Sequence, residues 1–241
     1  MKDAKIARLQ TKSISKLHCL KIAKLGHEYY SLKSFMNLPN LLTLSRIPLM
    51  LVVIGLLYPL PEESWPWVRT IALLVFLFAA LTDWLDGWLA RKFGQVSEFG
   101  KFMDALSDKV LTLGMFVSLL ALGELGKWAL FPILLILSRE LLITGLRLVA
   151  AGRGKTLAAE KIGKLKTVIQ LTCICLILGK ISAKVDLAEF ANESWHQNLV
   201  LVLDNSGSIT LLFATALTVY SGIVYLVKYW RFFIEENDQN A

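Results

Sequence analysis

The sequence predicts an all-α, polytopic membrane protein, with six transmembrane helices in one bundle and both termini in the cytoplasm. Hydrophobic residues make up 55% of the 241 residues. They are concentrated in blocks rather than spread along the chain, which is typical of membrane spans and not of a soluble core. Lysine and arginine are unevenly distributed between these blocks, which gives the orientation. The blocks lie at 41–58, 67–81, 102–122, 128–150, 168–178 and 209–229.

Two of the blocks are too short to cross a bilayer alone, since a spanning helix needs about 20 residues. The block at 67–81 reaches this length only if it continues through the polar motif that begins at Asp83. The block at 168–178 reaches it only if the basic residues before it are included. Both helices are therefore expected to carry polar residues inside the membrane or at its edge.

The basic residues favour one side of the predicted membrane. Sixteen lysine and arginine residues lie before the first block, between the second and third, and between the fourth and fifth, whereas four lie in the alternate loops. Loops rich in lysine and arginine stay in the cytoplasm. The segment 83–108 should therefore face the cytoplasm, as in a bacterial-type inner membrane. The same distribution accounts for the net charge of +7 without a nucleic-acid partner.

Three regions are predicted along the chain. Residues 1–36 form a basic cytoplasmic extension, which is either a helix on an anionic membrane surface or a mobile tail. Residues 37–232 form the six-helix domain, and 233–241 form a short polar tail. Cys173 and Cys175 lie in an apolar block, where a thiol is expected to act as a small packing residue.

Two pairs of aspartates flank the junction between the second and third blocks. The pairs are Asp83 with Asp86, and Asp104 with Asp108. At these spacings the two members of each pair share one face of a helix. A linker of about ten to fifteen residues, with Gly94 and Gly100, is expected to let the helices turn back. The four carboxylates would then meet.

Four carboxylates near a membrane would repel one another, and each costs about 2.5–3.5 kcal/mol at the bilayer centre. One or two divalent cations would offset this charge. Oxygen ligands alone select Mg²⁺ or Mn²⁺ for phosphate chemistry, or Ca²⁺. Gly87 and Ala90 keep the helix surface low, and the guanidinium of Arg91 suits two-point contact with a diphosphate.

The run from Asp83 to Asp108 resembles the signature of the CDP-alcohol phosphatidyltransferase family, D-x2-D-G-x2-A-R-x8-G-x3-D-x3-D, with no departure. The matching residues are Asp83, Asp86, Gly87, Ala90, Arg91, Gly100, Asp104 and Asp108. The resemblance extends from about Asn37 to the last block, with the N-terminal extension and a loop at 180–208 outside it.

This resemblance implies a six-helix membrane bundle, usually a homodimer, that holds two metal ions through the four aspartates. It also implies that Asp108 acts as general base. In the mechanism that follows, Asp108 takes the proton of an acceptor hydroxyl, the hydroxyl attacks the lipid-side phosphorus of a CDP-linked lipid, and CMP leaves. The residues expected at the CDP-lipid are Gly87, Arg91, Gly100, Asn40 and Thr43.

A second polar cluster is expected to bind the acceptor. Arg139 lies about midway along an apolar block, where a charge is a candidate functional residue. Arg147 follows about two turns later on the same broad side of the helix. With Lys164, they are expected to hold a phosphate on the acceptor. Glu140 is expected to pair with a neighbouring helix, since adjacent residues on one helix do not face each other.

Two strings suggest which acceptor is used. The run S-R-E-L-L-I-T-G-L-R, followed by A-A-E-K-I-G-K-L-K-T, resembles the phosphatidylglycerophosphate synthase branch of the family. This implies CDP-diacylglycerol and sn-glycerol 3-phosphate as substrates. The first block, N-L-P-N-L-L-T-L-S-R-I-P, points the same way. Asn40, Thr43 and Arg46 recur there at helical spacing and either contact the cytidine or anchor the helix.

Other functions are compatible with part of this pattern. Within the family the acceptor could instead be inositol phosphate, serine or phosphatidylglycerol, but an acceptor without phosphate would leave Arg139 and Arg147 without an anion. A divalent-cation transporter would need carboxylates spread across the membrane depth. A non-catalytic membrane scaffold would need no carboxylate cluster. The sequence therefore favours a lipid phosphotransferase.

Overall fold

The computed structural model describes residues 38–58, 67–93, 98–152, 161–188 and 193–234. Side-chain positions are described for 44–58, 67–82, 106–152, 165–188 and 194–229. In these segments the chain forms six α-helices and one short 3-10 helix, and no strand. The predicted all-α class is thus confirmed for the described residues.

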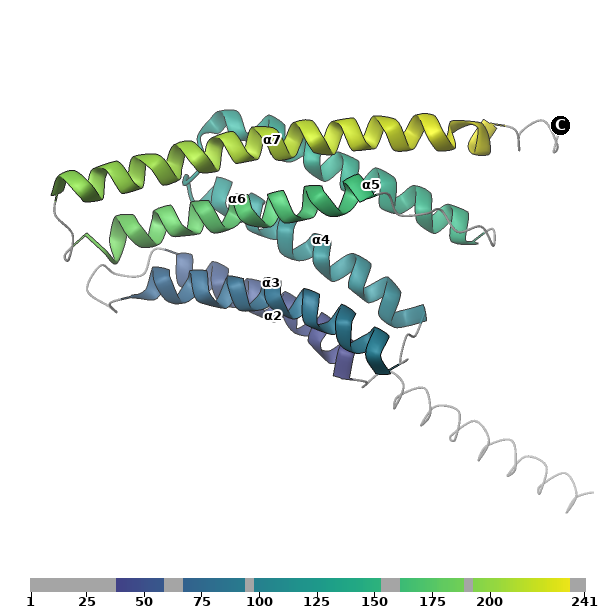
Figure 1. Cartoon of the computed structure of the whole chain (residues 1–241), viewed down its shortest axis with the longest axis horizontal. Helices are drawn as coiled ribbons and strands as arrows, with labels where there is room; N and C mark the ends of the chain where they lie inside the picture. The colour runs from purple at the N-terminus through teal and green to yellow at the C-terminus, as the bar shows by residue number, and fades with distance from the viewer. Residues whose placement is uncertain (1–37, 59–66, 94–97, 153–160, 189–192, 235–241) are drawn as a thin grey trace, which may run out of the picture.

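The helices run in alternating directions and lie side by side (Figure 1). In chain order they are α2 (Leu38–Leu57), α3 (Val68–Phe93), α4 (Glu98–Ala121), η1 (Lys127–Ala129), α5 (Leu130–Gly152), α6 (Lys161–Val185) and α7 (Glu193–Ile234). Because of this alternation, α3 and α5 end, and α4 and α6 begin, at one end of the bundle, on the right of Figure 1. We call this the aspartate end, and the opposite one the far end.

The two blocks that are too short to cross a bilayer alone are parts of longer helices. α3 continues through the aspartate motif to Phe93, and α6 begins at Lys161 within the basic segment. The predicted linker was wrong, because α4 already begins at Glu98 and so includes Gly100. Leucine, alanine, arginine and lysine favour helices, so the run from Leu89 to Lys92 extends α3 beyond the glycine of the motif.

The predicted loop at 180–208 was also wrong. Its first residues complete α6, and residues from Glu193 onward belong to α7, which has 42 residues. The early start of α7 is held by α6: His196 Nε2 lies 2.7 Å from the carbonyl oxygen of Ala183. Cys173 donates to the carbonyl of Gly207 across 3.4 Å. The polar residues that end the apolar run at this point therefore have partners on the neighbouring helix.

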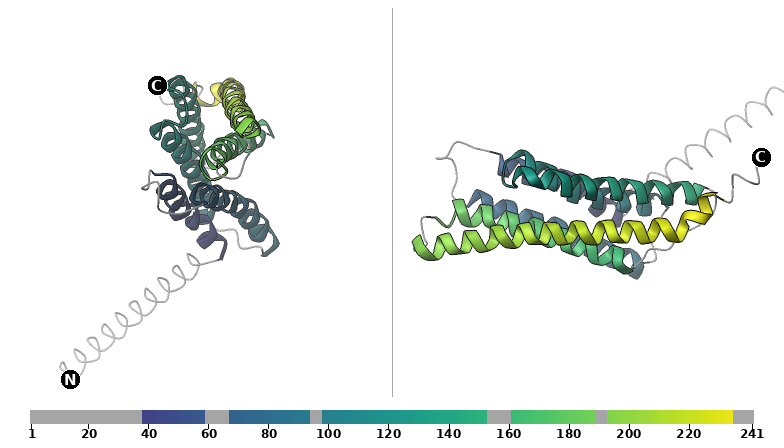
Figure 2. Two further views of the ribbon diagram at one scale, coloured as in Figure 1. Left: turned by 90° about the vertical axis from the view of Figure 1, so that its left-hand side faces the viewer. Right: turned by 90° about the horizontal axis from the view of Figure 1, so that it is seen from above.

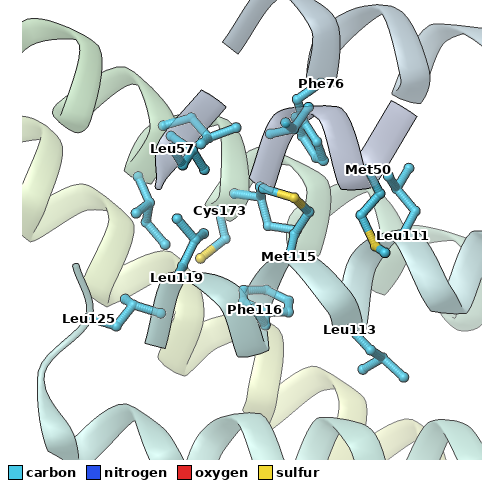
Figure 3. Packing of buried hydrophobic residues seen from close by; sticks show 14 of the residues in the cluster. Met50, Leu57, Phe76, Leu111, Leu113, Met115, Phe116, Leu119, Leu125 and Cys173 are labelled. Atoms are coloured by element: carbon cyan, nitrogen blue, oxygen red, sulfur yellow. The ribbon is translucent and has the colours of Figure 1, made fainter. Parts of the chain in front are cut away.

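The core lies where α2 packs against α3 and α4, and α6 packs against α3 and α7. Figure 3 shows side chains from four of these helices meeting there: Met50, Leu57, Phe76, Met115, Phe116, Leu119 and Cys173. The prediction that Cys173 is a packing residue is thus confirmed. Gly114 permits the close approach of α2 and α4, since a Cβ there would overlap the sulfur of Met50. Small residues commonly allow such contacts between membrane helices.

The outer surface of the bundle differs from that of a soluble protein. Large apolar side chains are exposed, such as Val227 at 71% and Phe131 at 72%. Four charged residues among those described are buried, including Arg46 at 0% and Lys166 at 5%. Such a surface fits lipid contact, and buried charges mark function in membrane proteins.

Length and composition agree with this assignment. Three helical stretches among the described residues are long and apolar enough to cross a membrane: Lys127–Gly152, Leu165–Val185 and Ser194–Tyr229. Two shorter apolar stretches are Leu44–Leu57 and Val68–Thr82. The chain is a membrane protein, and the count of six spans stays a prediction.

The far end is tied together by polar contacts. Lys180 on α6 lies 3.1 Å from Glu124, in the connection after α4, and 3.1 Å from Asp204 on α7. Asp186 accepts hydrogen bonds of 2.6 Å from the backbone N–H and the hydroxyl of Thr70 at the start of α3. These contacts fix the helices at the end remote from the aspartates. Figure 2 shows the same helices from two further sides.

Candidate active site

The aspartate motif is divided between two antiparallel helices. Asp83 and Asp86 are on the second half of α3, and Asp104 and Asp108 are on the first half of α4. Both pairs therefore lie toward the aspartate end (Figure 1). Among the residues predicted for metal, CDP-lipid and acceptor, several have side-chain surroundings outside the described part of the structure. They are Asp83, Asp86, Gly87, Arg91, Gly100, Asp104, Asn40, Thr43 and Lys164.

Asp108 is half-buried on α4, and its neighbours are anchored to α2. Arg46, which is fully buried, donates to the hydroxyl of Ser107 across 3.4 Å. Thr112 donates to the carbonyl oxygen of Asp108 across 3.0 Å. Of the two roles considered for Arg46, the anchoring role has a contact in the structure. This contact couples α2 to the turn of α4 that carries Asp108.

Arg139, midway along α5, reaches across to α7. Its Nη2 donates to the hydroxyl of Ser221 across 2.7 Å. The next residue, Gly222, leaves room for the stem of the arginine, since a Cβ there would lie 2.9 Å from Arg139 Cγ. Ser221 and Gly222 together form what we call the seat of Arg139. The hydroxyl of Ser221 accepts its hydrogen bond, and Gly222 leaves space for its side chain.

Glu140 has its expected partner on a neighbouring helix. Its Oε1 forms an ion pair with Nζ of Lys166 on α6. The same oxygen also lies 3.3 Å from Nη1 of Arg139, although adjacent residues on a helix were not expected to meet. The long arginine side chain makes this contact possible. Glu140 thus links both cations, and the three side chains are at most 11% exposed.

Lys166 was not among the predicted site residues, because it lies in a basic segment that membrane topology explains by itself. Its ammonium is buried in the bundle, and among the described residues Arg139, Lys109 and Asp108 are further charged groups that act on it. The sequence did contain one indication of this lysine: Glu140 is a carboxylate within an apolar block, and such a carboxylate requires a cationic partner. Lys166 thus lies close enough to Asp108 of α4 and to Arg139 of α5 to interact with both charges.

Arg147 confirms that the two arginines of α5 share one side. Its Nε donates to the hydroxyl of Tyr225 across 3.4 Å, and its guanidinium lies 5.3 Å from the centre of that ring. Tyr225 is one turn after Ser221, so α7 receives both arginines on one face. Unlike Arg139, Arg147 is exposed.

The cluster has an excess of positive charge. Arg139, Arg147 and Lys166 are cationic, and Glu140 is the carboxylate paired with two of them. Guanidinium and ammonium groups on the neighbouring helices α5 and α6 favour a phosphate or a carboxylate, and the fork of an arginine binds phosphate oxygens in pairs. The cluster is therefore suited to an anion, next to a turn that carries a carboxylate able to accept a proton.

Comparison with known proteins agrees with the motif. The model of the CDP-alcohol phosphatidyltransferase family matches residues 36–220. The chain belongs to this family. It is therefore a transferase of phospholipid biosynthesis, which does not fit the cation transporter considered from the sequence. The match is continuous across 180–208, so the expectation that this segment falls outside the resemblance was wrong.

Three curated relatives show which family members the chain is similar to. A CDP-diacylglycerol–glycerol-3-phosphate 3-phosphatidyltransferase of Bacillus subtilis is 34% identical over 81% of this chain and 96% of its own length. A protein of the same name from Rickettsia bellii is 32% identical, over 82% and 97%. A CMP-forming cardiolipin synthase of rice is 28% identical, over 89% of this chain and 64% of its own length.

Proposed function

We propose that this phosphatidyltransferase transfers the phosphatidyl group of CDP-diacylglycerol to sn-glycerol 3-phosphate, which yields phosphatidylglycerol phosphate and CMP. One observation supports this choice of acceptor. Arg139 and Lys166 both contact Glu140, and Lys166 is close enough to Asp108 to interact with its charge. A phosphomonoester with two negative charges suits three cations better than an uncharged acceptor does. The names of the bacterial relatives support the same acceptor.

The four aspartates would hold divalent metal, with Mg²⁺ or Mn²⁺ as the ion and two ions as the number. Their place toward one end of α3 and α4 and their purely oxygen donors support this assignment. Metal bound by these aspartates would supply positive charge, which offsets the negative charge of the diphosphate and of the phosphoryl oxygens in the transition state. We assign contacts with the CDP-lipid to Gly87, Arg91, Gly100, Asn40 and Thr43.

The chain's own residues perform the remaining steps. Arg139, Arg147 and Lys164, together with Lys166 beside Glu140, bind the phosphate of the acceptor and direct one of its two free hydroxyls toward α4. Asp108 accepts the proton of that hydroxyl as its oxygen forms a bond with the lipid-side phosphorus. The bond between this phosphorus and the oxygen that bridges it to the cytidine phosphate breaks, and CMP leaves with that oxygen.

The location of the site fits a donor in the membrane and an acceptor in water. We place the aspartate end at the cytoplasmic face of a bacterial-type inner membrane, because the basic residues 153, 155, 161, 164 and 166 precede or begin α6. A cysteine introduced at Lys155 should react with an impermeant maleimide only in inverted vesicles. Labelling from the outside would contradict this orientation. We also expect a homodimer, which crosslinking in native membranes would detect.

A comparison of acceptors tests the proposed function. The purified chain is given CDP-diacylglycerol in mixed micelles with glycerol 3-phosphate, inositol phosphate, serine or phosphatidylglycerol, and CMP release is measured. We expect release with glycerol 3-phosphate alone. The similarity to a cardiolipin synthase makes phosphatidylglycerol the second candidate. CMP release with that lipid, and none with glycerol 3-phosphate, would replace the proposed acceptor.

A further inference from the structure

The buried carboxylate of Glu140 lies at the centre of the cationic cluster. Its Oε1 contacts both Nη1 of Arg139 and Nζ of Lys166, and its side chain is 8% exposed. The contact brings α5 and α6 together, and Arg139 extends the connection to α7 through Ser221. One carboxylate oxygen therefore fixes two cations that come from different helices.

We propose that Glu140 is a positioning residue for the acceptor phosphate, which holds Arg139 and Lys166 at a fixed separation. This inference rests on the proposed use of glycerol 3-phosphate. Burial supports the assignment, since two long cationic side chains in a low-dielectric interior have few other ways to be satisfied. Without the carboxylate, their mutual repulsion would drive the guanidinium and the ammonium apart.

Removal of Glu140 has two opposite effects on an anionic acceptor. It takes away a negative charge, which by itself would strengthen binding of a phosphate. It also releases two cations from their positions, which weakens binding because the pairing of an arginine fork with phosphate oxygens depends on geometry. If Glu140 is a positioning residue, the release of the cations must outweigh the loss of negative charge. KM for the acceptor should then rise, whereas it should fall if the loss of negative charge is the larger effect.

The chain offers a matched control at the far end. Lys180, also on α6, pairs with Glu124 across 3.1 Å, much as Lys166 pairs with Glu140. The two lysines are about 21 Å apart along α6, at the helical rise of about 1.5 Å per residue. Glu124→Gln therefore removes a carboxylate from a lysine of the same helix, remote from the acceptor cluster.

The experiment measures KM for glycerol 3-phosphate, KM for CDP-diacylglycerol and kcat in the wild type, Glu140→Gln and Glu124→Gln. We expect Glu140→Gln to raise KM for glycerol 3-phosphate at least about tenfold, with KM for the donor within about twofold of the wild type. Glu124→Gln should leave both values unchanged. An unchanged or lowered acceptor KM in Glu140→Gln would overturn the proposal.

A double variant keeps the test decisive if Glu140→Gln does not fold. Glu140→Gln/Lys166→Met removes both charges of the pair, so no ammonium is left buried without its carboxylate. We expect this variant to fold and to keep the raised acceptor KM, because Lys166 no longer supplies a charge and Arg139 has lost the carboxylate that held it. A wild-type acceptor KM would show that Glu140 only neutralises Lys166. Absence of CMP release by the wild type with glycerol 3-phosphate would instead refute the proposed function.

Discussion

Arg46 on α2 donates a hydrogen bond to Ser107 on α4 across 3.4 Å, one residue before Asp108 in the chain. The guanidinium has no exposed surface, so this contact lies inside the bundle. It joins the first described helix to the helix of the proposed general base. The position of Asp108 thus depends on α2 as well as on α4.

The first prediction concerns this contact. Arg46→Met should lower kcat at least about tenfold, because a small displacement of a catalytic group has a large effect on rate. Arg69→Met provides a matched control, since Arg69 donates to the carbonyl oxygens of Leu56 and Tyr58 at the far end of α2. That variant should lose thermal stability and keep its kcat. Equal losses of kcat in both would show that Arg46 has only a general structural role.

The second prediction concerns the seat of Arg139 on α7. Gly222→Ala places a methyl group 2.9 Å from Arg139 Cγ, so the arginine must move. We expect KM for glycerol 3-phosphate to rise about tenfold, with little change in KM for the donor. Gly179→Ala is the control, because its Cβ would meet no atom within 4 Å. A wild-type acceptor KM in Gly222→Ala would remove Arg139 from the acceptor site.

The third prediction concerns the far end. Lys180→Met should lower the free energy of unfolding by about 1–3 kcal/mol, because it removes a buried partner of two carboxylates. The effect of Asp204→Asn should be smaller, at most about 1 kcal/mol, since the Asp204 side chain is 53% exposed and solvated. Thermal unfolding in detergent would measure both. A change in KM for the acceptor in Lys180→Met would contradict our assignment of stability to the far end and of acceptor binding to the aspartate end.

The sequence was sufficient for the features that depend on local pattern. The apolar blocks predicted the six α-helices of the described residues, and the short second block correctly implied that α3 continues through Asp83. The motif placed the aspartates on two helices. Arg139 stood out because charged residues are rare within apolar blocks. Each of these inferences uses residues that are close together in the chain.

What the sequence did not predict depends on contacts between distant segments. Lys166 belongs to a basic segment, and only the packing of α6 against α5 buries it beside Glu140. The early start of α7 likewise depends on α6, which provides partners for His196 and Asp204. The seat at Ser221 and Gly222 is recognisable only when α5 lies against α7. No local pattern encodes these pairings.

The fourth prediction concerns metal. Removal of divalent ions with EDTA should abolish CMP release, because the charge of four aspartates and of the diphosphate would be unbalanced. Addition of Mg²⁺ or Mn²⁺ in excess of the chelator should restore it. CMP release that persists after exhaustive chelation would contradict the assignment of a metal site to Asp83, Asp86, Asp104 and Asp108.

The most direct test of the central claim is the effect of Asp108→Asn on CMP release from CDP-diacylglycerol with glycerol 3-phosphate and Mg²⁺. Asp204→Asn is the matched control, because it makes the same change at the far end. We predict that Asp108→Asn lowers kcat at least about 100-fold, as expected for loss of a general base. The variant should unfold at a temperature close to that of the wild type, and Asp204→Asn should keep its kcat. A folded Asp108→Asn protein with a kcat near that of the wild type would contradict the claim.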